Sequence, residues 1–257
     1  MYYMLMEQNQ IVLKGQLVSY VYNQISANDC LLFLHGWGSS KEVWQITASK
    51  LVSQSANKPI SMYAMDLPGF GKSPLSSVRQ SEEGLSVADY AEVVKGFIEK
   101  LELKNVIIVG HSFGGRVGIK LSVLYPNYVK KLILVDSAGF VDNTLRKKLF
   151  NFVAKIIPTI LKNKFGKYFA SKDYLNSGNL KKTFIKVINE DLSEEMRKIN
   201  TPTLLIWGAD DTVTPVDFGY LMKSKIKNSK LKIIASAGHY SFLDKPEEFV
   251  KLLINFV

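Results

Sequence analysis

The sequence has very little cysteine and no long uninterrupted apolar run. Its 257 residues include one cysteine, Cys30, so a disulfide within the chain is excluded and an oxidising compartment is not implied. No stretch approaches the ~18 apolar residues of a membrane-spanning helix. The first residues, MYYMLMEQNQ, lack the positive and apolar regions of a secretory signal. We therefore expect a soluble, cytoplasmic protein without stable membrane contact.

Histidine is also scarce, and the charged residues form no recognisable binding motif. Three histidines and one cysteine cannot make a conventional zinc site, so neither a metal nor an organic cofactor is expected. The net charge is +10, but there is no zinc-finger spacing, RNP-like aromatic motif or arginine-rich tract. A nucleic-acid partner is therefore not expected, and no sequence feature specifies an oligomeric state.

Apolar runs of strand length alternate with helical patterns along most of the chain. Helices are predicted after an N-cap at Ser86 and over Phe113–Tyr125, among others. Strands are predicted in a leading pair that meets at Gly15 and in the runs 29–36, 59–66, 105–110, 130–136, 201–208 and 231–236. The later strands are apolar throughout rather than alternating. We therefore predict an α/β fold with a mostly parallel sheet that is covered by helices on both faces.

Residues 140–198 interrupt this alternation. They contain no convincing strand, whereas apolar residues from 145 to 161 recur at helical spacing, and Pro158 is expected to kink or split that helix. We interpret 140–198 as a helical cap inserted over the carboxyl edge of the sheet, with 1–139 and 199–257 forming the core domain. The apolar stripe of this cap is interpreted as the roof of a pocket, and contact with anionic lipid is the alternative.

The run IIVGHSFGGRVG, at 107–118, places a serine in a glycine-rich turn. Ser112 follows a buried strand and precedes a helix, and G-x-S-x-G in that context is typical of a nucleophile elbow. Side chains two residues before and after the serine would clash in so sharp a turn, which explains Gly110 and Gly114. The helix N-terminus also favours negative charge there. We predict Ser112 as a nucleophile; the alternative is a tight turn with an incidental serine.

A serine hydroxyl needs a base, and the chain offers three histidines. His111 is adjacent to Ser112 in the elbow, so its side chain is expected to point away. His35 lies at the end of another strand. His239 lies in the loop between the last strand and the last helix, at the same sheet edge as Ser112, and is the predicted base.

The base in turn needs a carboxylate that orients it. Asp211 follows the strand that precedes the strand of His239 and is the predicted acid. Asp136 follows the strand at 130–136 and is a second candidate, with capping of the next turn as its alternative role. Asp210 is interpreted as a turn residue.

Acyl transfer also needs N–H donors for a developing oxyanion. The N–H of Phe113, directly after the predicted nucleophile, is one candidate. Trp37 in the run HGWG is the other, because Gly36 and Gly38 allow that loop to turn inward. The Trp37 side chain is expected to line the pocket.

Five motifs, in this order along the chain, resemble those of the α/β-hydrolase fold family. They are HGWGSS at 35–40, DLPGFGKS at 66–73, GHSFGG at 110–115, WGADDTVTP at 207–215 and AGHYSFLDKPEEF at 237–249. The resemblance spans nearly the whole chain. It implies an eight-stranded, mostly parallel sheet with a helical cap after the sixth strand, and it places the triad acid on Asp211. The serine nucleophile argues against dehalogenase and epoxide hydrolase reactions, and HGWG indicates the compact, capped branch of the family.

We therefore predict a serine hydrolase that cleaves an ester or related acyl bond of a small, hydrophobic substrate. One alternative is a carbon–carbon bond hydrolase or lyase of the same fold acting on an anionic substrate. Arg116, one helical turn after Ser112, could face such an anion, or could instead be a surface residue or part of an ion pair. Another alternative is a receptor that binds a small ligand without turnover.

Overall fold

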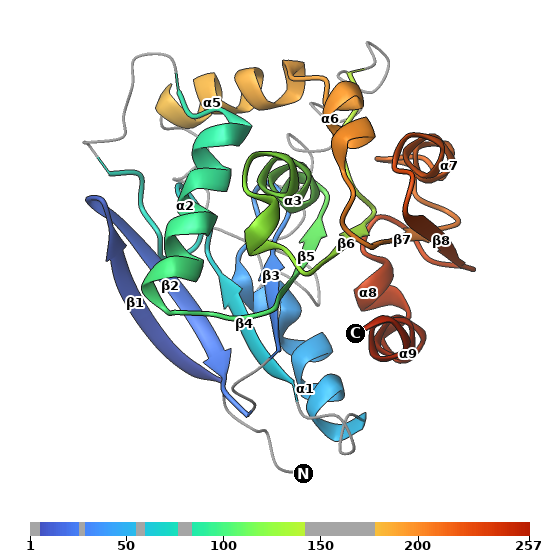
Figure 1. The fold of residues 1–257 in the computed structure, drawn as a ribbon, viewed down its shortest axis with the longest axis horizontal. Helices are drawn as coiled ribbons and strands as arrows, with labels where there is room; N and C mark the ends of the chain where they lie inside the picture. The colour runs from blue at the N-terminus through green and yellow to red at the C-terminus, as the bar shows by residue number, and fades with distance from the viewer. Residues whose placement is uncertain (1–5, 26–28, 55–59, 77–83, 142–177) are drawn as a thin grey trace.

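Eight strands form one sheet in the order β1-β2-β4-β3-β5-β6-β7-β8. The computed structural model describes residues 6–25, 29–54, 60–76, 84–141 and 178–257 (Figure 1). The strands are β1 (Glu7–Leu13), β2 (Gln16–Asn23), β3 (Cys30–Leu34), β4 (Ser61–Met65), β5 (Val106–His111), β6 (Lys131–Val135), β7 (Thr203–Gly208) and β8 (Ser229–Ile234). The predicted eight-stranded α/β fold is confirmed.

The six strands from β3 to β8 run parallel, and β1 and β2 add an antiparallel edge. The hairpin between β1 and β2 turns at Lys14 and Gly15, and both have positive φ, as a two-residue turn of this kind requires. Because the parallel strands end at the same edge, the segments that follow β3, β5, β6, β7 and β8 meet there. The predicted catalytic residues all lie in these segments.

Helices cover both faces of the sheet (Figure 1). Successive residues of a strand enter different cores: Leu32 of β3 packs with the residues of α2 (Val87–Lys100), α3 (Phe113–Leu124) and α7 (Asp217–Lys225), whereas Phe33 packs with α1 and α9. The second face carries α1 (Gln45–Gln54), α8 (Ser241–Asp244) and α9 (Pro246–Phe256). Burial of both strand faces explains why inner strands such as β3 are apolar throughout, whereas β8 at the sheet edge is largely exposed.

Local signals set several helix boundaries. The Ser86 hydroxyl accepts a hydrogen bond from the N–H of Asp89, and the Asp89 carboxylate accepts one from the N–H of Ser86. These two bonds form a capping box at the start of α2. The sequence pattern also predicts a helix over roughly 41–55, but this segment begins as one 3-10 turn, η1 (Lys41–Trp44), before α1. A second short 3-10 turn, η3 (Pro126–Tyr128), follows α3.

The chain between β6 and β7 contributes α5 (Gly178–Asn189) and α6 (Ser193–Lys198). The apolar face of α5 is buried, through Leu180, Phe184 and Val187 among others. The helix predicted at 145–161 lies outside the described residues. The described helices thus fall within the interval expected for the cap.

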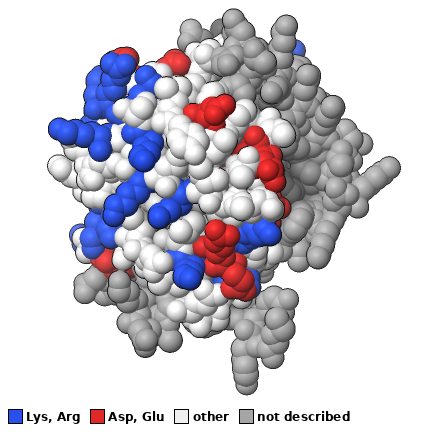
Figure 2. Space-filling view, turned by 90° about the vertical axis from the view of Figure 1, so that its right-hand side faces the viewer, with Lys and Arg blue, Asp and Glu red and all other residues white. Residues whose placement is uncertain are grey.

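The strand β8 forms one edge of the sheet and is unusually basic. The segment 217–234, which contains α7 and β8, has five lysines and a single acidic residue. Four of the lysines are exposed: Lys223, Lys227, Lys230 and Lys232. Figure 2 looks onto this side of the molecule and shows lysine and arginine side chains gathered over part of it.

Candidate active site

Ser112 occupies a strained turn between β5 and α3. Its φ of 50° and ψ of −107° lie outside the regions that a serine ordinarily adopts. A Cβ at Gly110 would lie 2.5 Å from the carbonyl oxygen of Gly114, and one at Gly114 would lie 2.4 Å from that of Leu34. Both positions therefore require glycine, as the elbow pattern predicts.

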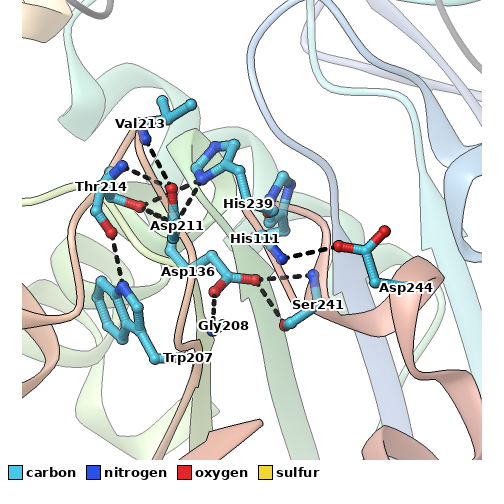
Figure 3. A network of polar contacts seen from close by, with 11 residues as sticks. His111, Asp136, Trp207, Gly208, Asp211, Val213, Thr214, His239, Ser241 and Asp244 are labelled. Atoms are coloured by element: carbon cyan, nitrogen blue, oxygen red, sulfur yellow. Dashed lines mark hydrogen bonds and ion pairs between the residues drawn. The ribbon is translucent and has the colours of Figure 1, made fainter. Parts of the chain in front are cut away.

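Asp211 is fixed in the loop after β7 by its own turn. One carboxylate oxygen accepts the N–H groups of Val213 and Thr214, at 2.7 and 2.9 Å. The other accepts the Thr214 hydroxyl at 2.8 Å and contacts Nδ1 of His239 at 2.8 Å (Figure 3). The carboxylate is buried, and two main-chain N–H groups and the Thr214 hydroxyl set its position.

His239 is buried in the loop after β8 and pairs with Asp211. Burial by itself lowers the pKa of His239, but the charge of Asp211, the hydrogen bond to it and the charge of Asp136 outweigh burial, so the pKa is raised. The carboxylate accepts a hydrogen bond from Nδ1–H of His239, so the lone pair of the neutral ring lies on Nε2. That is the tautomer that a general base requires.

His111, which directly precedes Ser112, connects the turn of Ser112 to the loop of His239. Nε2 of His111 donates to the carbonyl oxygen of His239 at 2.8 Å, and the two rings are 4.9 Å apart. Among the hydrogen bonds of the described residues there is none between the Ser112 hydroxyl and the His239 ring. In sites without substrate this bond is commonly long. The contact of His111 with the main chain of His239 is not evident from the sequence.

The loop after β3 lies directly against the elbow. A Cβ at Gly36 would approach Nδ1 of His111 to 2.9 Å and Cβ of Ser112 to 3.4 Å. His35 is buried, donates from Nδ1 to the carbonyl oxygen of Gly36 and accepts the N–H of Leu67 at Nε2. His35 therefore holds the loop that carries Trp37 and is not in contact with the predicted triad.

A buried ion pair fastens the same loop. Nζ of Lys41 lies 2.6 Å from the Asp66 carboxylate, and both side chains are 0% exposed. Asp66 also accepts the N–H groups of Lys41 and Lys72. At Gly71, which has positive φ, a Cβ would lie 2.3 Å from this carboxyl group. Lys41, directly after the motif at 35–40, thus meets the motif at 66–73 around one carboxylate.

In the described part of the chain, aromatic rings surround Trp37 in the loop after β3, which we call the oxyanion loop. The Trp37 ring lies about 5 Å from the rings of Phe70, Phe113 and Phe184. Phe184 comes from α5, so the chain between β6 and β7 closes over this part of the site. The Trp37 and Phe113 side chains are thus in direct contact. The N–H of Phe113 is the first of α3 and has no acceptor within the helix.

Arg116 does not face the open side of the site. It is 2% exposed, and its guanidinium donates to the main-chain carbonyl oxygens of Glu190 and Phe140. Four residues later, Lys120 forms ion pairs with Glu190 and Glu195. The two side chains therefore tie α3 to the segment between β6 and β7, which is a different role from the anion contact or surface position considered from the sequence.

Asp136 is also buried at this edge, but its carboxylate contacts Gly208 and Ser241 rather than the ring of His239. Asp210 is exposed, and its N–H donates to the carbonyl oxygen of Ala237, which suits a turn residue.

Within the described residues, no group of three or more His, Cys, Asp or Glu side chains could hold a metal ion.

A serine on a strained turn between a central parallel strand and its helix, with an acid–base pair at the same edge, defines the hydrolase architecture of the nucleophile-elbow class. The model of the alpha/beta hydrolase family matches residues 31–252. The chain belongs to this family and is a hydrolase. None of the helices in the described residues is long and apolar enough to cross a bilayer.

Similar proteins span several hydrolase activities. The chain is 26% identical to a 2-hydroxy-6-oxononadienedioate/2-hydroxy-6-oxononatrienedioate hydrolase of Pseudomonas putida, over 91% of each chain. It is 26% identical to monoacylglycerol lipase ABHD6 of Mus musculus, over 88% of this chain and 75% of that one. The crystal structure of a membrane phospholipase A superposes with a TM-score of 0.80 at 24% identity, over 98% of this chain and 85% of that one. These likenesses agree on the fold and differ in substrate.

Proposed function

We propose that this chain is a serine hydrolase that cleaves an ester or related acyl bond of a small, hydrophobic substrate. The observation that carries the proposal is the contact between Asp211 and Nδ1 of His239 at 2.8 Å, at the sheet edge where the strained turn presents Ser112. Along the chain the order is nucleophile, acid and base (Ser112, Asp211, His239), which is the order of the family's triad. No metal or organic cofactor is required.

In this mechanism Nε2 of His239 takes the proton of the Ser112 hydroxyl as its oxygen attacks the substrate carbonyl carbon. The N–H groups of Trp37 and Phe113 stabilise the oxyanion. The tetrahedral intermediate expels the alcohol, which receives the proton from His239, and an acyl-enzyme remains. Water, deprotonated by the same ring, then releases the acid. Asp211 holds the ring and stabilises its protonated form throughout.

The aromatic residues around the oxyanion loop favour an apolar acyl group. Trp37, Phe70 and Phe184 supply ring surface, and Arg116 is engaged with main-chain oxygens. The segment 140–198 acts as a cap that roofs the pocket in this proposal. Membrane contact, nucleic acid and a bound cofactor have no part in it.

A second candidate is a hydrolase of carbon–carbon bonds in an anionic substrate. It is favoured by relatives named as 2-hydroxy-6-oxononadienedioate/2-hydroxy-6-oxononatrienedioate hydrolases, one of which aligns over 91% of both chains. Such a substrate is a dicarboxylate and needs cationic contacts. Arg116 is committed elsewhere, so these contacts would have to come from other residues.

The test is turnover of p-nitrophenyl acetate, butyrate and octanoate by the wild type and by Ser112→Ala, with fluorophosphonate labelling of Ser112. Steady turnover that is lost in the variant supports the serine esterase, and the preferred chain length sizes the pocket. A burst without turnover supports a ligand-binding receptor. Labelling without ester turnover supports the second candidate. Absence of labelling refutes an active Ser112.

The acid is tested by a matched pair of substitutions in neighbouring residues. Asp211→Asn removes the charge that orients His239, and we expect kcat to fall by about 10⁴-fold, as for the loss of a triad carboxylate. Asp210→Asn makes the same chemical change at an exposed position and is expected to retain wild-type activity. Equal activities in the two variants would refute the role of Asp211.

The activity is expected to depend on the protonation of His239. The base must be neutral to accept the serine proton, so activity falls as the pH drops through the pKa of His239. Because that pKa is raised, the acid limb of the kcat/KM profile lies above the ordinary histidine value of about 6.5. An acid limb below that value would contradict the pairing with Asp211.

A further inference from the structure

Asp136 is a completely buried carboxylate that the proposed mechanism does not use. It directly follows β6, and its φ of 44° is in the left-handed region, which non-glycine residues rarely adopt. A residue kept in such a conformation is held there by its surroundings. The contacts of its side chain and main chain show what those surroundings are.

The Asp136 carboxylate joins the end of β7 to the start of α8, which lie far apart in the sequence. Oδ1 accepts the N–H of Gly208 at 2.7 Å, three residues before Asp211. Oδ2 accepts the hydroxyl of Ser241 at 2.6 Å and its N–H at 3.2 Å, two residues after His239. Figure 3 shows the carboxylate between these two partners, below the Asp211–His239 pair.

The main chain of Asp136 makes a further contact with the same pair. Its carbonyl oxygen lies 3.0 Å from the Thr214 hydroxyl. That hydroxyl also contacts Oδ2 of Asp211 at 2.8 Å and Nδ1 of His239 at 3.2 Å. Asp136 therefore touches the surroundings of the acid and of the base through two independent groups.

We propose that Asp136 is a positioning residue: it clamps the loop of His239 against the loop of Asp211, and its negative charge stabilises the protonated base. This inference rests on the proposed function, because it assigns Asp136 to the same acid–base pair. It differs from the sequence-based alternative in which Asp136 itself orients His239, since the carboxylate bonds to Gly208 and Ser241 and not to the ring.

The electrostatic part of the inference follows from the charges around His239. Several described titratable groups lie around it: Asp211 from the loop after β7, Asp136 from the end of β6, His111 from β5, the adjacent Tyr240, and Asp244 of α8, which binds the N–H of Gly238. Only the carboxylates can be negative at neutral pH. Burial and the like charge of Asp211 raise the pKa of Asp136 to about 7, while the charge of His239 and the hydrogen bonds from Ser241 and Gly208 act in the opposite direction.

The experiment compares Asp136→Asn and Ser241→Ala with the control Asp210→Asn. The first removes the charge at nearly constant shape and also replaces one of the two acceptor oxygens with an amide donor. The second removes one hydroxyl of the clamp, and the third changes an exposed carboxylate in the same loop region. The rate of fluorophosphonate labelling of Ser112 is measured against pH. The imidazole titrations are followed by NMR, which is simplified because the chain has only three histidines.

For Asp136→Asn we expect a fall in the pKa of His239 and a labelling rate reduced by about 10- to 100-fold, as for a displaced catalytic group. Ser241→Ala should reduce the labelling rate less, and Asp210→Asn should match the wild type. Wild-type titration and labelling in folded Asp136→Asn would overturn the inference.

If Asp136→Asn does not fold, Ser241→Ala decides: a folded variant with the wild-type labelling rate would overturn the clamp. If the wild type itself is not labelled, the proposed function fails instead. The histidine titrations still test the coupling in that case, because they do not depend on catalysis. A pKa of His239 that is the same with and without the Asp136 charge would then refute it.

Discussion

Replacing Lys41 with methionine would remove the cation from an ion pair that has no access to solvent. The Asp66 carboxylate would keep two N–H donors, from Lys41 and Lys72, but would lose the only cation whose side chain contacts it among the described residues. A buried charge left without its partner costs about 3–5 kcal/mol. For a chain of this size that is a fall in Tm on the order of 10 °C.

The matched control is the surface pair of Lys14 and Glu92. Its N–O distance is 2.8 Å, against 2.6 Å for Lys41 and Asp66, but the side chains are 78% and 40% exposed. Lys14→Met should therefore cost less than about 1 kcal/mol, because water already solvates both charges. Urea unfolding of the wild type and the two variants measures both free energies directly.

The double variant Lys41→Met/Asp66→Asn separates charge from packing. If the cost comes from an uncompensated carboxylate, removing that carboxylate restores part of the stability lost in Lys41→Met. The reasoning is refuted if Lys41→Met costs no more than Lys14→Met, or if the double variant is less stable than Lys41→Met alone.

Three further outcomes follow from close packing and burial. Gly114→Ala places a Cβ 2.4 Å from the Leu34 carbonyl oxygen, so we expect a lower Tm and loss of fluorophosphonate labelling; normal values of both would contradict the tight turn. Cys30 is buried, and burial raises the pKa of its thiol to about 12, so Ellman's reagent should react only after unfolding. Rapid reaction of the native protein would show that β3 opens readily. Arg116→Met removes the donors of two main-chain oxygens, so limited proteolysis should cut the segment between β6 and β7 faster than in the wild type; an unchanged cleavage rate would disprove this tie.

The sequence predicts the fold because strand and turn signals are local. The runs that form β3, β5 and β7 are apolar throughout, and Ser86 and Gly15 mark boundaries that follow from hydrogen bonding and backbone freedom alone. The 3-10 start of η1 is not predicted. Lys41 there is buried toward Asp66, which is a tertiary contact that helical spacing does not contain.

The site is predicted less completely, for the same reason. Ser112, His239 and Asp211 belong to motifs whose spacing and position at strand ends predict a triad, and the structure brings Asp211 and His239 into contact. Asp136 also follows a strand, so its sequence position allows the role of the acid that orients His239. Only its contacts with Gly208 and Ser241 in the folded chain favour the proposed clamp over that role.

The contacts of Arg116 with main-chain oxygens follow from where the segment between β6 and β7 folds back onto α3, which no local pattern specifies. The contact of His111 with the main chain of His239 has the same origin, since it joins residues 128 positions apart.

The lysines of β8 have a consequence for how this protein behaves in concentrated solution. An outermost strand offers unpaired main-chain groups to another chain, and Lys230 and Lys232 surround those groups of β8 with like charge. Two copies meeting along this strand would bring lysines together, which opposes strand addition. Salt weakens that repulsion, because at 0.1 M charges more than about 10 Å apart are largely screened from each other. The colloidal stability of the protein should therefore decrease as ionic strength rises, although its folded structure does not change.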